Sequence, residues 1–276
     1  ISPNVMLVET PSNNTSATIA MRGGVTINPA ITWEPTVGVY LDGVYLGKTQ
    51  GAIFDVVDLE RVEILRGPQG TLYGRNTLGG AINLISQRPN GSGIETKLTL
   101  GNYGLTQAQF ISDFELAEGT YGKLVVNSKE RDGYVHNAPG PYGGAQGVVP
   151  SADPTVNELD TINSHGFRFT IARDTDNSSF DLSVDYNDQS NTPPFAQLGY
   201  TIPNWSAAFG VGASPATGGL KLWPVELYTS KGRSKIAHVN EAVFEKSEVS
   251  GIALTYSRDI NLGTVKAILA RRDTEW

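Results

Sequence analysis

The feature that most constrains the fold is an alternation of apolar and polar residues that recurs from residue 94 onward. It is clearest over residues 180–187, where the apolar side chains are Phe180, Leu182, Val184 and Tyr186 and the polar ones are Asp181, Ser183, Asp185 and Asn187. Successive side chains of a β-strand point to opposite faces, so such a run predicts a strand between two different media. The same pattern covers Ile94–Gly101, 107–116 and Phe167–Ile171 and, more weakly, Tyr121–Arg131, Glu248–Arg258 and Leu262–Trp276. The sequence therefore predicts an antiparallel sheet of about seven strands.

The connections between these strands fall into two length classes. Tight turns are predicted at Asn102–Gly104, Ala117–Thr120, Asp174–Ser178 and Asn261–Gly263, whereas Asp132–Ser164 and Ser190–Lys246 are long. Loops of that length are uncommon in compact soluble domains, but an outer-membrane barrel has short turns at one end and long loops at the other. A soluble antiparallel sandwich also alternates, because one face of each strand packs on a core. About seven strands with apolar outer faces do not close a barrel, so the barrel interpretation implies an incomplete one; the chain stops at Trp276 inside a candidate strand, which agrees with truncation.

Residues 1–90 lack the long alternating runs of the later part of the chain and instead hold short apolar runs between glycine, proline and arginine. These runs predict a small α+β domain, with a helical turn at Phe54–Leu59 and strands at Ala17–Met21, Val37–Leu41, Arg61–Leu65 and Ala81–Ser86. The segment Arg88–Gly93 breaks every regular pattern. We therefore predict two domains, at 1–90 and 91–276.

Composition excludes several classes of function. A net charge of −7 and a pI near 5.0 argue against nucleic-acid binding, which needs a basic face. The absence of cysteine excludes thiolate metal sites, disulfides and a cysteine nucleophile. The three histidines, His136, His165 and His238, are far apart in the sequence and form no ligand pair, so we predict neither a metal nor a cofactor. We interpret them as solvated residues in or near the long loops, and contact of one of them with an iron or cobalt chelate is the alternative. No nucleophile elbow or catalytic carboxylate pair is recognisable, so we do not expect an enzyme.

The most specific stretch runs Val37-Gly38-Val39-Tyr40-Leu41-Asp42-Gly43-Val44-Tyr45-Leu46-Gly47 and continues over residues 58–83. Asp-Gly between apolar runs predicts a primed hairpin turn, and Gly67-Pro68 predicts an abrupt strand end. Gly74 to Gly79-Gly80 predicts another reversal; its spacing resembles a phosphate loop, but the Lys-Ser/Thr that such a loop needs is absent. This stretch resembles the plug signature of TonB-dependent outer-membrane receptors, and the matching positions are Asp42, Gly43, Glu63, Gly67, Pro68, Gly70, Tyr73, Gly74, Gly79 and Gly80.

The resemblance implies a small α+β plug domain followed by the first antiparallel transmembrane β-barrel strands, located in the bacterial outer membrane. It implies active import of a scarce solute, such as an iron siderophore or similar chelate, a carbohydrate or cobalamin, without covalent chemistry. The expected partners are outer-membrane lipid, the solute, and TonB, which would bind an N-terminal box that we expect to precede Ile1.

The resemblance also implies site residues. Arg22 and Arg66 match plug arginines that pair with barrel-wall glutamates, although each could simply end a strand at a solvated surface. Solute contact is expected on the turn Tyr45–Phe54, through Tyr45, Lys48 and Gln50, where ordinary turn decoration is the alternative. The loop aromatics Tyr142, Trp205 and Trp223 could stack on a solute or sit at the membrane interface.

Two other classes of function stay open at this point. A soluble β-sandwich that binds carbohydrate would explain the strands and loop aromatics but not the plug-like stretch. A secreted β-rich hydrolase would need a nucleophile or a carboxylate pair.

Overall fold

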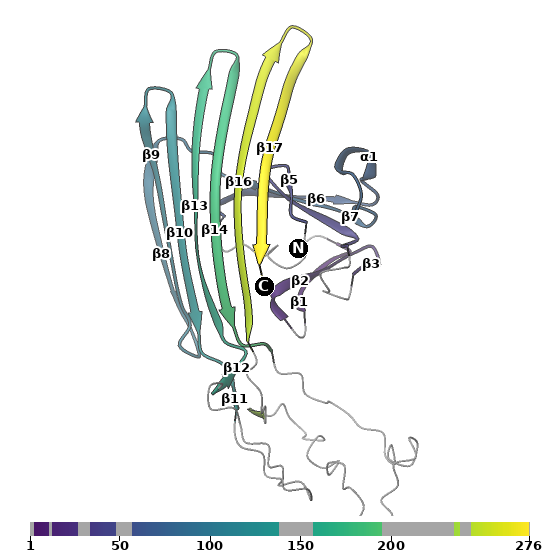
Figure 1. The fold of residues 1–276 in the computed structure, drawn as a ribbon, viewed down its shortest axis with the longest axis vertical. Helices are drawn as coiled ribbons and strands as arrows, with labels where there is room; N and C mark the ends of the chain where they lie inside the picture. Colours follow the sequence, from purple (N-terminus) through teal and green to yellow (C-terminus); the bar gives the residue numbers. More distant parts are fainter. Residues whose placement is uncertain are drawn as a thin grey trace, which may run out of the picture.

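The computed structural model describes residues 3–10, 13–26, 34–47, 57–137, 157–194, 235–237 and 244–275. The chain forms two main units: an N-terminal unit of two small sheets, and a tall curved sheet, called the wall below, whose concave side faces the N-terminal unit (Figure 1). Within the described residues, no helix has the length and apolar character needed to cross a membrane.

The wall is a seven-stranded antiparallel sheet in the order β17-β16-β14-β13-β10-β9-β8. Its strands are β8 (Ser92–Leu100), β9 (Thr106–Ala117), β10 (Thr120–Arg131), β13 (Ile162–Thr175), β14 (Ser178–Asn191), β16 (Glu245–Ile260) and β17 (Gly263–Glu275). The tight turns β9–β10, β13–β14 and β16–β17 lie together at one end of the wall (Figure 1). Each strand predicted from alternation is present, and its neighbours in the sheet follow chain order.

The two faces of the wall have opposite character. On the outer face, large apolar side chains such as Phe180, Leu182 and Ile252 are exposed, whereas the inward positions Ser183 and Asp185 between them are buried. The pairing register places residues of the same face next to one another on neighbouring strands, since Leu182 lies opposite Leu254 and Asp185 opposite Gly251. The wall thus presents an apolar surface outward and a polar, charged surface toward the N-terminal unit.

The N-terminal unit holds the apolar core. One sheet joins β1 (Val5–Thr10), β2 (Asn13–Met21) and β3 (Gly24–Val25) in that order. The other, mixed sheet has the order β5-β4-β7-β6, built from β4 (Val37–Leu41), β5 (Val44–Tyr45), β6 (Leu59–Arg66) and β7 (Gly80–Ser86). Side chains from both sheets meet in one cluster: Ile19, Met21, Val37, Val39, Leu41 and Leu46.

One predicted element of this unit is wrong. A helical turn was expected at Phe54–Leu59, but Leu59 opens β6, no helix forms at Val57 or Asp58, and residues 54–56 lie outside the described residues. Among the described residues, the single helical turn is α1 (Gly70–Tyr73), inside the glycine-rich reversal. Leu59, the last residue of the expected turn, instead pairs with Ser86 of β7, so sheet pairing overrides local helix preference.

A third small sheet lies beyond the other end of the wall. It joins β11 (Val135–Asn137), β12 (Glu158–Leu159) and β15 (Ile236–Ala237) in the order β12-β11-β15. β11 and β12 belong to the first long connection and β15 to the second, and β11 pairs in parallel with β15. The two long connections are therefore joined by backbone hydrogen bonds.

Candidate functional site at the interface of the two units

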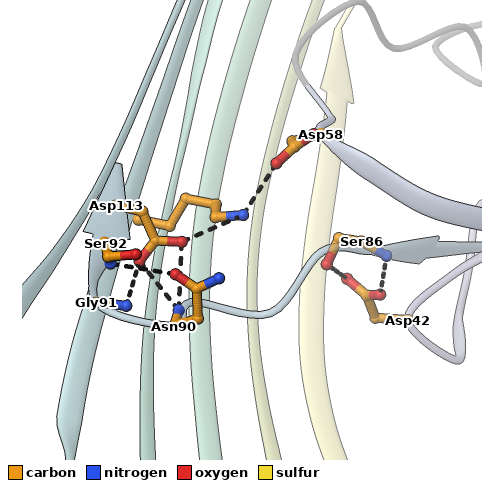
Figure 2. Close-up of polar contacts among 8 residues, drawn as sticks. Asp42, Asp58, Ser86, Asn90, Gly91, Ser92 and Asp113 are labelled. Atoms are coloured by element: carbon orange, nitrogen blue, oxygen red, sulfur yellow. Dashed lines mark hydrogen bonds and ion pairs between the residues drawn. The ribbon is translucent and has the colours of Figure 1, made fainter. Parts of the chain in front are cut away.

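The β4–β5 hairpin directs a carboxylate toward the wall. Asp42 and Gly43 both have positive φ, 51° and 87°, as a primed two-residue turn requires. The Asp42 carboxylate accepts hydrogen bonds from the Ser86 backbone N–H and hydroxyl, both at 2.8 Å (Figure 2). Its Oδ2 also lies 2.7 Å from Nη2 of Arg168 on β13. The hairpin residue predicted only as a turn former is thus a bridge between the two units.

Arg168 is part of a charged row across the inward face of the wall. Arg168 Nη1 and Arg272 Nη2 each bind Oδ1 of Asp185, at 3.0 Å and 2.9 Å. These residues come from β13, β17 and β14, so Arg272 must reach across β16 to its partner. The residue that it crosses is Gly251, where a Cβ would lie 2.6 Å from Arg272 Nη2. We call Arg168, Asp185 and Arg272 the wall row.

A second bridge links the two units next to the connection between them. Lys123 on β10 is buried and lies 2.9 Å from Asp58, which precedes β6, and 3.4 Å from Asp113 on β9. Asp113 also accepts hydrogen bonds from the backbone N–H groups of Asn90 and Gly91 (Figure 2). One wall carboxylate therefore fixes both a lysine and the segment that joins the two units.

The connecting segment is held at a third point by Arg88. Its guanidinium makes two hydrogen bonds to Asp174, at 2.6 Å and 2.8 Å, and one to Asp181 at 2.6 Å. The hydrogen bonds to Asp174, opposed by partial burial, hold the pKa of Arg88 above its ordinary value. Both acceptors lie beside the tight β13–β14 turn, so the connection is fastened to that end of the wall.

Four of the signature glycines, Gly67, Gly74, Gly79 and Gly80, occupy positions where a larger residue would be strained. Gly67, Gly74 and Gly80 have positive φ. A Cβ on Gly80 would lie 2.2 Å from Met21 Sδ and 2.3 Å from the Leu65 carbonyl oxygen. Gly79 is also close-packed, with 3.2 Å between its would-be Cβ and Val37 Cγ2. The glycine-rich reversal therefore lets β7 enter the sheet directly against the core.

The other signature residues form local contacts. Gly67-Pro68 follows the end of β6, and Gly70 opens α1. The Tyr73 carbonyl accepts a hydrogen bond from the Tyr40 hydroxyl at 2.6 Å. Glu63 accepts hydrogen bonds from Arg61 and Asn83, which lower its pKa, Arg61 more strongly.

The remaining predicted site residues are placed as follows. Arg66 Nη1 donates to the Pro3 carbonyl at 3.4 Å, and the Arg22 backbone N–H donates to the Asn4 carbonyl. Neither arginine has an ion pair within the described residues, so their pairing with the barrel stays a prediction. The Tyr45 hydroxyl accepts a hydrogen bond from Asn76 at 3.1 Å. Lys48, Gln50, Tyr142, Trp205, Trp223 and His238 lie outside the described residues.

The two described histidines do not share a site. His136 is in β11, and His165, on the outer face of β13, lies 3.0 Å from the Ser128 hydroxyl and 3.8 Å from Glu130. Within the described residues, no group of three or more histidine, cysteine or acidic residues has the arrangement of a metal site.

Sequence reasoning missed the residues that join the two units. Arg168, Lys123, Asp185 and Arg272 were recognisable only as polar members of alternating strands. A signal was present, because a charged residue such as Arg168 between Phe167 and Phe169 predicts a charge on the inward face. Which charges meet depends on the register between strands, which no single strand specifies.

Comparison with known proteins gives a consistent result. The family described as "TonB-dependent Receptor Plug Domain" matches residues 2–81. The pesticin receptor of Yersinia enterocolitica is 40% identical over 83 residues, which are 30% of this chain and 12% of that protein. The catecholate siderophore receptor Fiu of Escherichia coli K12 is 35% identical over 96 residues, 34% of this chain and 11% of that protein. The chain thus aligns with only about a tenth of the length of these relatives.

Solved structures extend the likeness to the wall. The ferric yersiniabactin uptake receptor FyuA of Yersinia pestis superposes with a TM-score of 0.70 at 17% identity, over 99% of this chain and 37% of that one. Fiu in its open form gives a TM-score of 0.62 at 21% identity, over 93% and 33%. At such identities the likeness establishes the fold: a plug domain beside part of a β-barrel.

Proposed function

Because the chain belongs to the TonB-dependent receptors, we propose that it forms the plug and part of the barrel wall of a receptor that imports a ferric siderophore across the bacterial outer membrane. The import involves no covalent chemistry. The solute binds at the end of the barrel where the long connections lie, and energy from the inner membrane arrives through TonB. The N-terminal unit, residues 1–90, is the plug, and residues 91–276 belong to the barrel.

The observation that carries this proposal is the distribution of side chains on the wall, which is apolar on the outer face and charged on the inward face. Its outer face exposes Phe180, Leu182 and Ile252, as acyl chains require, and its inward face buries Lys123 and Arg168 against the plug. A soluble sandwich needs the reverse, with apolar side chains between two sheets. The carbohydrate-binding sandwich therefore fits the wall poorly, because the side that faces another unit is the charged one.

The class of solute follows from the relatives. The relatives are named as receptors for pesticin and for catecholate siderophores, and one of the superposed structures is a ferric yersiniabactin uptake receptor. We infer an iron chelate for this chain also. Tyr45, held by Asn76 beside Tyr40, is the described residue that we propose for solute contact, together with Lys48 and Gln50.

Transport requires the plug to leave its resting contacts. Solute bound on one side and TonB on the other act on the same movable domain, which couples the two sites. The contacts that must break are the bridges Asp42–Arg168 and Asp58–Lys123, because each joins plug to wall through a charge pair with at least one largely buried member. Arg22 and Arg66 are proposed as further anchors, to parts of the wall beyond these contacts.

A reversible tether between plug and wall tests the proposal. A Cβ on Gly43 at the tip of the hairpin would lie 2.9 Å from Ile268 Cδ1 on β17, so we expect the cysteines of Gly43→Cys and Ile268→Cys to lie close enough to be joined by oxidation, although Gly43→Cys adds strain at φ 87°. The chain has no other cysteine to compete. A receptor containing this chain is expressed in bacteria without their own siderophore receptors, and uptake of radiolabelled iron is measured with catecholate and other ferric siderophores.

Three results are expected. The parent receptor imports iron only when TonB is present, the oxidised double-cysteine receptor does not import, and a reductant restores uptake. The two single-cysteine receptors are the controls and import with or without reductant. Iron uptake that is independent of TonB, or unaffected by the oxidised tether, would contradict the proposed function.

A further inference from the structure

A tyrosine occupies a backbone position that is unfavourable for it. The β8–β9 turn, at the end of the wall opposite the other tight turns, has Tyr103 and Gly104 at its centre, with φ of 59° and 64° (Figure 1). The Leu105 backbone N–H donates to the Asn102 carbonyl, as in a primed two-residue hairpin turn. Such turns favour asparagine, aspartate or glycine, so a bulky residue with positive φ is strained. Strain of this kind concentrates at ligand-binding sites, which calls for a functional reason for the Tyr103 side chain.

The turn is fastened to the start of the first long connection. The Tyr103 carbonyl accepts a hydrogen bond from the Asp132 backbone N–H at 2.9 Å. Gly104 also packs closely there, because a Cβ on it would lie 2.5 Å from Asp132 Oδ2. These contacts place the Tyr103 ring beside that of Tyr134, with 5.6 Å between the ring centroids and 56° between the ring planes. The backbone of two separate segments therefore fixes where the Tyr103 ring lies.

Tyr134 lies in turn against an arginine at the end of β10. The Arg131 guanidinium carbon is 4.9 Å from the centroid of the Tyr134 ring. Arg131 is held in place by Asp160, which it contacts through Nη2 at the carboxylate Oδ1, 2.9 Å away, and at the backbone carbonyl. We call Tyr103, Tyr134 and Arg131 the aromatic row. Its support by an ion pair makes it a preorganised surface and not a chance contact between mobile side chains.

The aromatic row lies where a solute would arrive, and its outer ring is accessible. Tyr103 is 48% exposed, so about half of its surface is open to a ligand. Arg131 has an inward position on β10, in alternation with the buried residues Lys123 and Asn127, so the row ends on the side of the wall that faces the plug. Aromatic rings stack on other planar rings, and a cation already lies against Tyr134. The row therefore suits an electron-rich ring better than a second cation.

We propose that the aromatic row is a stacking site for a planar aromatic ring of the solute, such as the catecholate ring of an iron chelate. Tyr103 makes the contact, and Tyr134 and Arg131 are positioning residues that hold its ring. This inference rests on the proposed import function and narrows it to chelates that carry an aromatic ring. It also gives the strained turn a role, because a residue that fits the turn better would lack the ring.

Two iron chelates that differ only in a ring test the site. The iron(III) complexes of benzohydroxamate and acetohydroxamate have the same donor atoms and the same charge, but the first carries phenyl groups and the second methyl groups. Their binding to a purified receptor that contains this chain is measured by equilibrium dialysis with radiolabelled iron. We expect the parent receptor to bind the benzohydroxamate complex about fivefold more tightly, the effect of one aromatic pair.

Substitutions in the turn locate the preference for the ring. Tyr103→Asn removes the ring but suits the positive φ, so a lost preference cannot come from a misfolded turn. Tyr103→Phe keeps the ring and should keep the preference. Phe244→Asn is the matched control, because Phe244 is an exposed aromatic residue directly before β16 and outside the row. Should Tyr103→Asn fail to accumulate in the membrane, Tyr134→Leu replaces it, with the same expected loss.

The outcomes separate the site from the import function. No preference in the parent, a preference that survives Tyr103→Asn, or an equal loss in Phe244→Asn would overturn the proposal. If Tyr103→Asn lowers barrel stability in lipid vesicles but leaves the preference unchanged, the ring contacts the membrane interface and the proposal is also wrong. A receptor that imports iron without preferring the ring would lose the stacking site and keep the import function. A preference for the ring without TonB-dependent uptake would do the reverse.

Discussion

The plug and the wall bury opposite kinds of side chain. In the plug, Met21, Val37 and Leu41 are buried together and the charges lie outside, as in any soluble domain. In the wall, Arg168 and Asp185 are buried and Leu182 is exposed. The difference agrees with the two surroundings that the proposed receptor gives the wall, lipid outside and the plug inside. The plug therefore has two roles: it forms its own apolar core, and it supplies the polar groups that meet the charged inward face of the wall.

The first way to break this comparison acts on the plug core. Gly80→Val should destabilise the plug by about 4 kcal/mol, because Met21 Sδ and the Leu65 carbonyl occupy the space and φ is 149°. Urea unfolding of the plug, followed by protease sensitivity with the barrel intact, measures the change. Gly70→Ala is the matched control, since a Cβ there meets nothing within 4 Å. An equal effect of both variants would show that close packing at Gly80 is not the cause.

The next change acts on the buried charges between the units. Lys123→Gln leaves Asp58 and Asp113 without their shared cation, and should weaken plug retention by about 3 kcal/mol. The same unfolding measurement reports it. In the Asp58→Asn background the cost should fall, because one of the two carboxylates is gone. A Lys123→Gln effect below about 0.5 kcal/mol, the range of ordinary surface changes, would argue that the buried lysine does not hold the plug.

The smallest of the three changes tests the outer face. Leu182→Arg should cost about 2 kcal/mol of barrel stability in lipid vesicles, because Leu182 lies in the apolar band. Lys246→Arg, on the same face near the end of β16, is the control and should change stability little. Barrel unfolding followed by tryptophan fluorescence measures both. No cost for Leu182→Arg would mean that this face does not contact lipid.

Much of the architecture could be predicted from the sequence, because alternation specifies a strand and its two faces. The Asp42-Gly43 turn was also readable, since few residue pairs accept positive φ twice. The helical turn at Phe54–Leu59 was not, because pairing of Leu59 with Ser86 decides its conformation. The short strands β11, β12 and β15 have two or three residues each, too few for a periodic signal.

The site was less predictable than the fold. Asp42 was identified as a turn former, but its contact with Arg168 joins positions that are 126 residues apart. The wall row depends on the register of four strands and on Gly251. The need for glycine at that position follows only from the structure, in which the Arg272 side chain lies across it. The pairing predicted for Arg22 and Arg66 involves no partner among the described residues and stays a prediction.

A double-mutant cycle between Asp42 and Arg168 tests most directly the claim that wall cations hold the plug by its carboxylates. The free energy of plug unfolding in urea is measured for Asp42→Asn, Arg168→Gln and the double variant in one receptor background. The account predicts a coupling energy of about 2 kcal/mol, with the double variant less destabilised than the sum of the two single variants. Additive effects, within about 0.3 kcal/mol, would contradict it.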